Sequence, residues 1–218
     1  MGLLNLLFKK PKSRFTKVPF HQYVGDWINC FESRPDAPPD MGTLRNIYDK
    51  ITLPKRSSDG SAGYDFMLPF SFKLKKGESI TIPTGICCQM EDSEFLMILP
   101  RSGQGFKYRV SLVNTAGIID SDYFNNRSNL GHIMIKIVYD GVPEKKTNLI
   151  SSRCHEVRLN GDIQLFLESE SESIDSLPSE LRFDAYKGIA QGIILRYGRA
   201  SEDKITHKRE GGFGSSGM

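Results

Sequence analysis

Short segments in which apolar and polar residues alternate dominate the chain from Ile47 onward and restrict it to a β architecture. The alternation runs through residues 70–74 and 133–137, and turn residues such as those at 75–78 separate one segment from the next. A period of two predicts strands with one buried face. Residues 95–99 form a continuous apolar run, which predicts a strand buried on both faces. Because helical periodicity is almost absent, the pattern favours an all-β sandwich, jelly roll or barrel.

Two segments interrupt this pattern. The stretch Ser102–Tyr108 predicts one short helical turn with a serine near its N-cap. Residues 142–182 predict an insertion outside the core. In it, Val157–Leu167 predicts a hairpin that turns at Asn160-Gly161. The alternating Glu and Ser of residues 168–173 then predict a solvated loop.

The organisation of the chain follows from these patterns. Residues 1–45 show little periodicity and predict a poorly ordered N-terminal extension. Residues 46–218 predict one domain, which is large enough to bury a good core. Its last segment, residues 208–218, is rich in glycine and predicts a mobile tail.

Charge and cysteine content argue against several classes of protein. The chain has 29 basic and 26 acidic residues, and this net charge of +3 gives no indication of a basic face for nucleic acid. The four cysteines have neither the spacing of a zinc site nor the density of a disulfide framework, and they fit a reduced cytoplasm. No apolar run approaches the ~20 residues that span a bilayer. We therefore expect a cytoplasmic protein with no transmembrane segment and no nucleic-acid binding.

The C-terminal tail has the composition of an anion-binding loop. Lys208 and Arg209 precede four glycines, two serines and one aromatic ring, Phe213. Glycines let backbone N–H groups approach phosphate oxygens, and arginine adds a planar fork of donors. The ring of Phe213 is suited to lie over a base. Glycine- and serine-rich termini are more often linkers, so the tail indicates a site only together with the rest of the chain.

Two clusters follow predicted turns and strands. Asp65 places one carboxylate at a strand end, where it could hold the water shell of a metal, although Gly-Tyr-Asp is also ordinary turn chemistry. Arg101, Ser102 and Gly103 come directly after the apolar run. They offer a guanidinium, a hydroxyl and backbone N–H groups, as phosphate sites do. A capped turn with Arg101 in solvent explains the same residues equally well.

Two further clusters lie later in the chain. Asp120 and Asp122 would project to the same side of an extended segment, and Tyr123 beside them could pack on a sugar. A carboxylate at a strand end can orient and deprotonate water, and an Asx-type turn is the alternative. Gln191 lies among the small residues of 188–192. There an amide could donate to a phosphate, or the segment could be a β-bulge.

Taken in order, these clusters and the tail resemble the motifs of the trimeric dUTPase family. The family pattern is an Ala-Gly-Tyr-Asp block, an Arg-Ser-Gly block, an Ile-Asp-x-Asp-Tyr block, an Ile-Ala-Gln block and a terminal Gly-Gly-Phe-Gly-Ser-x-Gly block. All five blocks occur here in that order, with Asn114 six residues before Asp120 as in the family. The resemblance covers residues 46–141 and 183–217, and it leaves the N-terminal extension and the insertion outside.

The resemblance implies a β jelly roll that assembles as a homotrimer and hydrolyses dUTP to dUMP and pyrophosphate with Mg²⁺. Asp120 would activate the water that attacks the α-phosphorus. Asp65 would hold water molecules of the Mg²⁺ shell. Asn114 and the backbone near Gly117 would read the uracil edge. Tyr123 would pack against the deoxyribose and leave no room for a 2′-hydroxyl.

The resemblance also assigns the contacts to the phosphates. In the tail, Arg209 would bind the γ-phosphate and Phe213 would cover the base, while closure of the tail would exclude bulk water. The remaining phosphate contacts would come from Arg101, Ser102, Gly103, Gln191, Gly214 and Ser215.

Two departures from the family pattern affect these assignments. After Tyr123 the family often continues Arg-Gly-Glu or Arg-Gly-Asn, whereas residues 124–129 here form a longer turn next to the sugar pocket. The terminal arginine of the family often stands where Lys208 stands in this chain. Lys208 and Arg209 are therefore alternatives for the γ-phosphate contact.

Two other functions are compatible with the same resemblance. A dCTP deaminase-like enzyme shares the jelly roll but needs a glutamate general base, and residues 114–123 contain none. A nucleotide-gated interaction protein would use the same fold to control a protein partner. The insertion at 142–182 and the N-terminal extension are the segments through which such a partner would bind.

Overall fold

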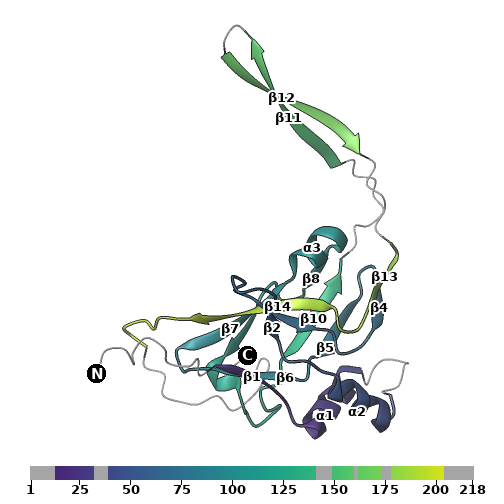
Figure 1. Cartoon of the computed structure of the whole chain (residues 1–218), viewed down its shortest axis with the longest axis vertical. Helices are drawn as coiled ribbons and strands as arrows, with labels where there is room; N and C mark the ends of the chain where they lie inside the picture. Colours follow the sequence, from purple (N-terminus) through teal and green to yellow (C-terminus); the bar gives the residue numbers. More distant parts are fainter. Residues whose placement is uncertain (1–12, 32–38, 141–148, 160–161, 173–177, 204–218) are drawn as a thin grey trace.

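The computed structural model of the chain describes residues 13–31, 39–140, 149–159, 162–172 and 178–203. Strands predominate over helices in these ranges (Figure 1), so the predicted all-β class is confirmed. The strands are β1 (Arg14–Lys17), β2 (Lys55–Arg56), β3 (Tyr64–Met67), β4 (Phe72–Lys75), β5 (Ser79–Pro83), β6 (Ile86–Gln89), β7 (Glu94–Pro100), β8 (Val110–Leu112), β9 (Gly117–Asp120), β10 (Met134–Tyr139), β11 (Leu149–Leu159), β12 (Asp162–Glu172), β13 (Glu180–Phe183) and β14 (Gly188–Arg196). The helices are α1 (Phe20–Phe31), α2 (Met41–Asp49), α3 (Ser102–Tyr108) and the 3-10 helix η2 (Ser121–Tyr123).

Two antiparallel sheets form the body of the protein. The larger has the strand order β2-β3-β14-β7-β9, and the smaller has the order β5-β10-β8. Strand β14 comes from the end of the described chain but lies between β3 and β7, so the largest sheet is completed by a distant segment. The pairs β1-β6 and β4-β13 extend the β structure at its margins.

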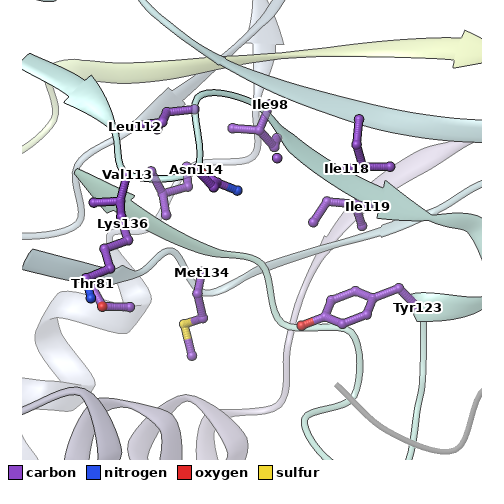
Figure 2. Close-up of a pocket in the computed structure, with 12 residues that line it drawn as sticks. Thr81, Ile98, Leu112, Val113, Asn114, Ile118, Ile119, Tyr123, Met134 and Lys136 are labelled. Carbon is purple, nitrogen blue, oxygen red and sulfur yellow. The ribbon is translucent and has the colours of Figure 1, made fainter. Parts of the chain in front are cut away.

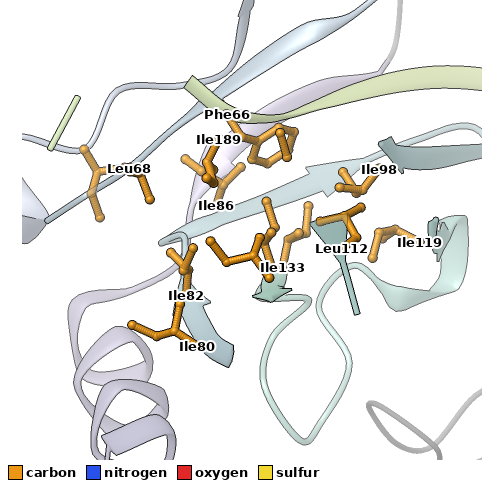
Figure 3. Packing of buried hydrophobic residues seen from close by; sticks show 14 of the residues in the cluster. Phe66, Leu68, Ile80, Ile82, Ile86, Ile98, Leu112, Ile119, Ile133 and Ile189 are labelled. Carbon is orange, nitrogen blue, oxygen red and sulfur yellow. The ribbon is translucent and has the colours of Figure 1, made fainter. Parts of the chain in front are cut away.

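The buried side chains of both sheets form one hydrophobic cluster (Figure 3). In β10 the predicted alternation is confirmed, because Ile135 and Ile137 are buried and Lys136 between them is exposed. In β7 the prediction of burial on both faces is wrong for the single chain. Leu96 and Ile98 are buried, whereas the residues that alternate with them are half-buried, because the outward face of this strand is covered only in part.

The expectation of a poorly ordered extension is wrong for the described part of residues 1–45. Strand β1 pairs with β6, and α1 packs on the core through an aromatic stripe formed by Tyr23, Trp27 and Phe31. These rings stand four residues apart and therefore share one face of the helix. Helix α2 follows, with the side chain of Asp40 accepting hydrogen bonds at its N-terminus. The extension is thus part of the folded unit.

The two segments that were predicted to interrupt the strand pattern, the short helix and the hairpin, are both present. Helix α3 occupies the predicted residues, and Ser102 lies next to the N-cap residue, Arg101. Strands β11 and β12 form the predicted hairpin in register, with Val157 opposite Gln164. Their turn at Asn160-Gly161 lies outside the described residues.

The hairpin is longer than predicted and projects away from the two sheets (Figure 1). The expected acidic loop is wrong for residues 168–172, which continue β12 and pair with residues 149–153 of β11. Backbone pairing of this kind needs no apolar face, so an alternation of Glu and Ser is compatible with it. None of the helices in the described ranges is long and apolar enough to cross a membrane.

Tyr23 provides a test of the packing of the extension. Its side chain is fully buried, burial raises the pKa of its hydroxyl, and within the described residues that hydroxyl has no hydrogen-bond partner. A buried polar group without a partner costs about 1–3 kcal/mol. We therefore expect Tyr23→Phe to raise the free energy of unfolding by about 1 kcal/mol. Denaturant unfolding followed through Trp27, the single tryptophan, measures the change.

Tyr139→Phe is the matched control for this measurement. Tyr139 is also fully buried, but its hydroxyl donates to the carbonyl oxygen of Pro178 at 2.6 Å. Its loss should lower the free energy of unfolding by about 1 kcal/mol. Equal losses of stability in the two variants would contradict the difference between the two hydroxyl groups.

Candidate active site

The first group of predicted site residues comes together where β3, β14 and the end of β7 lie side by side. Asp65 and Gln191 are directly opposite each other in the β3–β14 register. Arg101 Nε lies 3.4 Å from Asp65 Oδ1, and Gln191 Nε2 donates to the carbonyl oxygen of Pro100 at 3.3 Å. The Asp65 side chain is 13% exposed and that of Arg101 is 41% exposed. We call Asp65, Arg101 and Gln191 the polar cluster.

Glycines allow the members of the polar cluster to lie this close to the backbone. A Cβ at Gly188 would lie 2.0 Å from Arg101 Nη1, and one at Gly63 would lie 2.8 Å from Gln191 Oε1. The β14 register against β3 shifts between Gly188 and Ala190, so the β-bulge considered for this segment is present. The two interpretations of this segment, a β-bulge and an amide side chain available to a phosphate, are therefore compatible.

Ser102 and Gly103 begin α3 directly after Arg101, and both are exposed. Arg101 does not extend freely into solvent, since its guanidinium lies against Asp65. The chain thus presents a guanidinium, an amide side chain, a hydroxyl group and exposed backbone within one short stretch of surface. These groups are suited to hydrogen-bond an anion such as a phosphate.

A second group of predicted residues lines a cavity of about 510 Å³ between the two sheets (Figure 2). Asn114, Gly117 and Tyr123 all contribute to its wall, together with apolar side chains from β7, β8, β9 and β10. A Cβ at Gly117 would lie 3.3 Å from the Cβ of Ile98, so a larger residue would crowd the wall. We call this cavity the apolar pocket.

Buried hydrogen bonds hold the ring of Tyr123 in the wall of the apolar pocket. Its hydroxyl donates to the carbonyl oxygen of His132 at 3.0 Å and accepts from Asn129 Nδ2 at 2.6 Å. Asn126 Nδ2 donates to the carbonyl oxygen of Tyr123 and to Asn129 Oδ1, both at 2.8 Å. Gly131 has φ +79°, and a Cβ there would lie 2.8 Å from the same carbonyl oxygen of Tyr123. The longer turn after Tyr123 is therefore an ordered frame for the ring.

Asp120 lies outside the apolar pocket, at the exposed end of β9. It pairs with Phe95 at the start of β7. The extended segment that would place Asp120 and Asp122 on the same side is not present, because Ser121–Tyr123 forms a 3-10 helix. Asp120 remains next to the pocket in sequence, since Tyr123 follows three residues later.

One chain does not bring Asp120 to the polar cluster. Asp65 is opposite Gln191, Gln191 is opposite Leu99, and Phe95 is opposite Asp120. The two carboxylates are thus three strand spacings apart across the sheet and four residues apart along β7. At about 4.8 Å per strand and about 3.3 Å per residue, their backbones are roughly 20 Å apart. They are too far apart to act on the same phosphorus atom.

The predicted contacts from the tail lie outside the described residues. They are Lys208, Arg209, Phe213, Gly214 and Ser215.

The donor set fits Mg²⁺ only in an indirect role. Within the described ranges, no three His, Cys, Asp or Glu side chains are grouped as a metal site. A single carboxylate such as Asp65 can still hold water molecules of an Mg²⁺ ion that is bound mainly by phosphate oxygens, because Mg²⁺ usually retains several waters. The polar cluster is compatible with that arrangement.

Asn126, Asn129 and His132 hold Tyr123 from behind and belong to none of the predicted motifs. The one available signal was the unusual length of the turn at 124–129, which indicated a change in the sugar pocket without showing its form. The structure reveals that two buried asparagines and a backbone carbonyl form this frame.

These features define an all-β protein with a polar cluster and a separate apolar pocket. A family model described as dUTPase matches residues 49–138. The deoxyuridine 5′-triphosphate nucleotidohydrolase of Sodalis glossinidius is 34% identical over 124 residues, which cover 50% of this chain and 82% of the relative. That of Lactococcus lactis is 39% identical over 87 residues, which cover 40% of this chain and 58% of the relative. The chain belongs to the dUTPase family.

The extent of these matches varies. The chain spans only 52% to 60% of the length of four curated relatives, among them that of Lactococcus lactis. The crystal structure of dUTPase from Streptococcus mutans aligns with 68% of this chain and 88% of its own, with 23% identity and a TM-score of 0.48. The residues matched by the family model include Asp65, Arg101, Asn114, Asp120 and Tyr123.

Proposed function

We propose that the protein is a dUTP diphosphatase that hydrolyses dUTP to dUMP and pyrophosphate. The observation that carries the proposal is the apolar pocket, in which the Asn114, Gly117 and Tyr123 of the family motif line one cavity. Its volume of about 510 Å³ falls within the roughly 300–1,000 Å³ of small-molecule sites. The names of the curated relatives support the same substrate.

In the proposed complex, the apolar pocket holds the nucleoside. The Asn114 amide can both donate and accept hydrogen bonds, which suits the uracil edge. Gly117 adds no side chain to the wall, and its crowded surroundings disfavour the extra methyl group of thymine. Tyr123 packs against the deoxyribose, and its fixed ring excludes a 2′-hydroxyl. Substrate choice would then rest on shape and on a few hydrogen bonds.

The phosphates bind at the polar cluster and at the start of α3. Arg101, Ser102, Gly103 and Gln191 supply the donors. Asp65 would hold water molecules of an Mg²⁺ ion that arrives with the triphosphate, and that ion would supply positive charge to offset the phosphates. The pairing of Arg101 with Asp65 orients the guanidinium before substrate arrives.

Asp120 is the proposed general base. It takes a proton from the water that attacks the α-phosphorus, and the leaving group is pyrophosphate. Its exposed position at the end of β9 lets it approach a substrate whose nucleoside lies in the neighbouring pocket. The tail residues Arg209 and Phe213 would complete the site, with Lys208 as the alternative contact for the γ-phosphate. Gly214 and Ser215 would close over the phosphates.

The distance between Asp120 and the polar cluster supports a homotrimer in which two copies of the chain complete each site. Ile193, Met97 and Ile118 are paired across β14, β7 and β9. Alternation places this apolar row on the same outward face as Asp120, and Ile118 is 53% exposed. Such a row is typical of a surface that another subunit covers. A neighbouring copy could bring its own polar cluster to Asp120.

Two alternative functions differ in their support. The described residues that line the apolar pocket include no glutamate, which disfavours a dCTP deaminase-like reaction. The projecting β11–β12 hairpin favours an additional interaction with a protein partner (Figure 1). We place the enzyme in the cytoplasm because its four scattered cysteines fit a reduced compartment. If deletion of residues 142–182 leaves the set of binding partners unchanged, the protein does not bind a partner through the hairpin.

The primary test is release of pyrophosphate from dUTP, with dCTP, dTTP and UTP measured in parallel. We expect rapid release from dUTP alone in Mg²⁺ and its loss in EDTA, because the phosphates need the cation for charge neutralisation. Tight binding of dUTP without turnover would reject the diphosphatase and favour the nucleotide-gated interaction protein. Conversion of dCTP to dUTP with release of ammonia would favour the deaminase.

Asp120→Asn tests the general base. The amide cannot accept the proton from water, so kcat should fall by at least ~10² while dUTP affinity and oligomeric state remain unchanged. Asp122→Asn, two residues away on the 3-10 helix, is the control and should retain most of the activity. Dissociation of the oligomer in Asp120→Asn would show that this carboxylate is structural.

Mixed oligomers test whether two copies of the chain complete each site. Asp120→Asn and Arg101→Ala should each be nearly inactive when pure. In oligomers co-expressed from both, about a quarter of the sites should combine an intact Asp120 from one copy with an intact Arg101 from another, and activity should return accordingly. If the mixed oligomers are as inactive as the parents, one chain provides the whole site.

A further inference from the structure

Helix α1 of the N-terminal extension reaches a buried histidine that the proposed reaction does not use. Asp26 Oδ2 lies 2.7 Å from His132 Nδ1. The Asp26 residue is 7% exposed and His132 is fully buried. Gln22 Nε2, one turn earlier on α1, donates to the same Asp26 oxygen at 2.9 Å. The extension and the body of the protein therefore meet at a buried polar contact.

The hydrogen bonds to the two ring nitrogens define the state of His132. The backbone N–H of Gly85 donates to His132 Nε2 at 2.7 Å, so Nε2 is the acceptor. In the neutral imidazole the proton is then on Nδ1, which donates to the Asp26 carboxylate. Gly85 is itself held by the extension, because its carbonyl oxygen accepts from Val18 N–H at 3.0 Å. The His132 ring is thus fixed at both nitrogens.

The backbone of His132 holds the wall of the apolar pocket. Its carbonyl oxygen accepts from the hydroxyl of Tyr123 at 3.0 Å and from Asn129 Nδ2 at 3.2 Å. Asn129 Nδ2 also donates to the Tyr123 hydroxyl at 2.6 Å, which closes a three-membered network. One side of His132 therefore contacts α1, and the other side fixes the aromatic ring that lines the pocket.

We propose that Asp26 is a positioning residue for the nucleoside pocket, acting through His132 on Tyr123. By orienting the imidazole, Asp26 fixes the carbonyl oxygen that holds the Tyr123 hydroxyl. The ring of Tyr123 then stays close enough to the sugar to exclude a 2′-hydroxyl. This inference rests on the proposed function, because it assigns to the extension a part in choosing dUTP over UTP.

The decisive variant is Asp26→Ala. Removal of the carboxylate leaves His132 Nδ1–H without its acceptor, and the frame behind Tyr123 loosens. We expect KM for dUTP to rise and the ratio of kcat/KM for dUTP to that for UTP to fall by about 10-fold, with a smaller change in kcat. Asp26→Asn retains a side-chain oxygen that can accept from Nδ1–H, so it should restore most of the ratio.

Tyr48→Phe, in helix α2 just after the extension, is the matched control. It removes a hydrogen bond of 2.7 Å from the Tyr48 hydroxyl to the carbonyl oxygen of Val18, in which neither His132 nor Asp26 takes part. It should weaken docking of the extension without changing the dUTP/UTP ratio. Equal shifts in Tyr48→Phe and Asp26→Ala, or no shift in a folded Asp26→Ala, would overturn the inference. If Asp26→Ala does not fold, Gln22→Ala should shift the ratio in the same direction by a smaller factor, and an unchanged ratio overturns the inference.

Amide hydrogen exchange separates this inference from the proposed function. Asp26→Ala should speed exchange at residues 129–133, and Tyr48→Phe should not. A wild-type protein that hydrolyses dUTP, with unchanged specificity and exchange in Asp26→Ala, would reject the positioning role alone. A wild-type protein that does not hydrolyse dUTP would reject the proposed function, and the exchange at residues 129–133 would then decide whether Asp26 fixes the frame.

Discussion

The double pairing of β14, with β3 on one side and β7 on the other, is the constraint on which the site depends. It places Gln191 opposite Asp65 and fixes the polar cluster relative to the core. The pairing requires Gly192, where a Cβ would lie 2.9 Å from the side chains of Leu96 and Phe66. Because close-packed interiors do not absorb an extra methyl group without movement, a change at this inner position would displace the outward residues beside it.

Much of the fold could be predicted from the sequence because the relevant patterns are local. The alternation at 133–137 and the helix Ser102–Tyr108 follow from neighbouring residues alone. Helix α1 was missed although Tyr23 and Trp27 carry its aromatic stripe. The helix has only three turns, and a charged residue, Asp26, lies on its buried face, so only a few residues carry the helical pattern.

The residues proposed for the candidate site come from local motifs, whereas their arrangement in space could not be predicted from such motifs. Each motif is a short run, but the separation of Asp65 from Asp120 depends on the order of strands in the sheet, with β14 inserted from a distant part of the chain. The contact between Asp26 and His132 joins residues 106 positions apart, and no local pattern indicates such a pair. A buried polar contact of this kind becomes visible only when both elements are placed.

The period of two in β7, β9 and β14 assigns different tasks to the two faces of the largest sheet. On the inward face, Gly192, Ile98 and Gly117 are paired in one row beside the core and the apolar pocket. The outward face carries Asp120 and the apolar row that a neighbouring subunit would cover. The two faces meet in the short segment from β9 into the 3-10 helix, where Asp120 points outward and Tyr123 is buried. Contacts that hold Tyr123 from inside therefore also limit where the proposed general base can lie, which links the packing of the extension to chemistry on the opposite face.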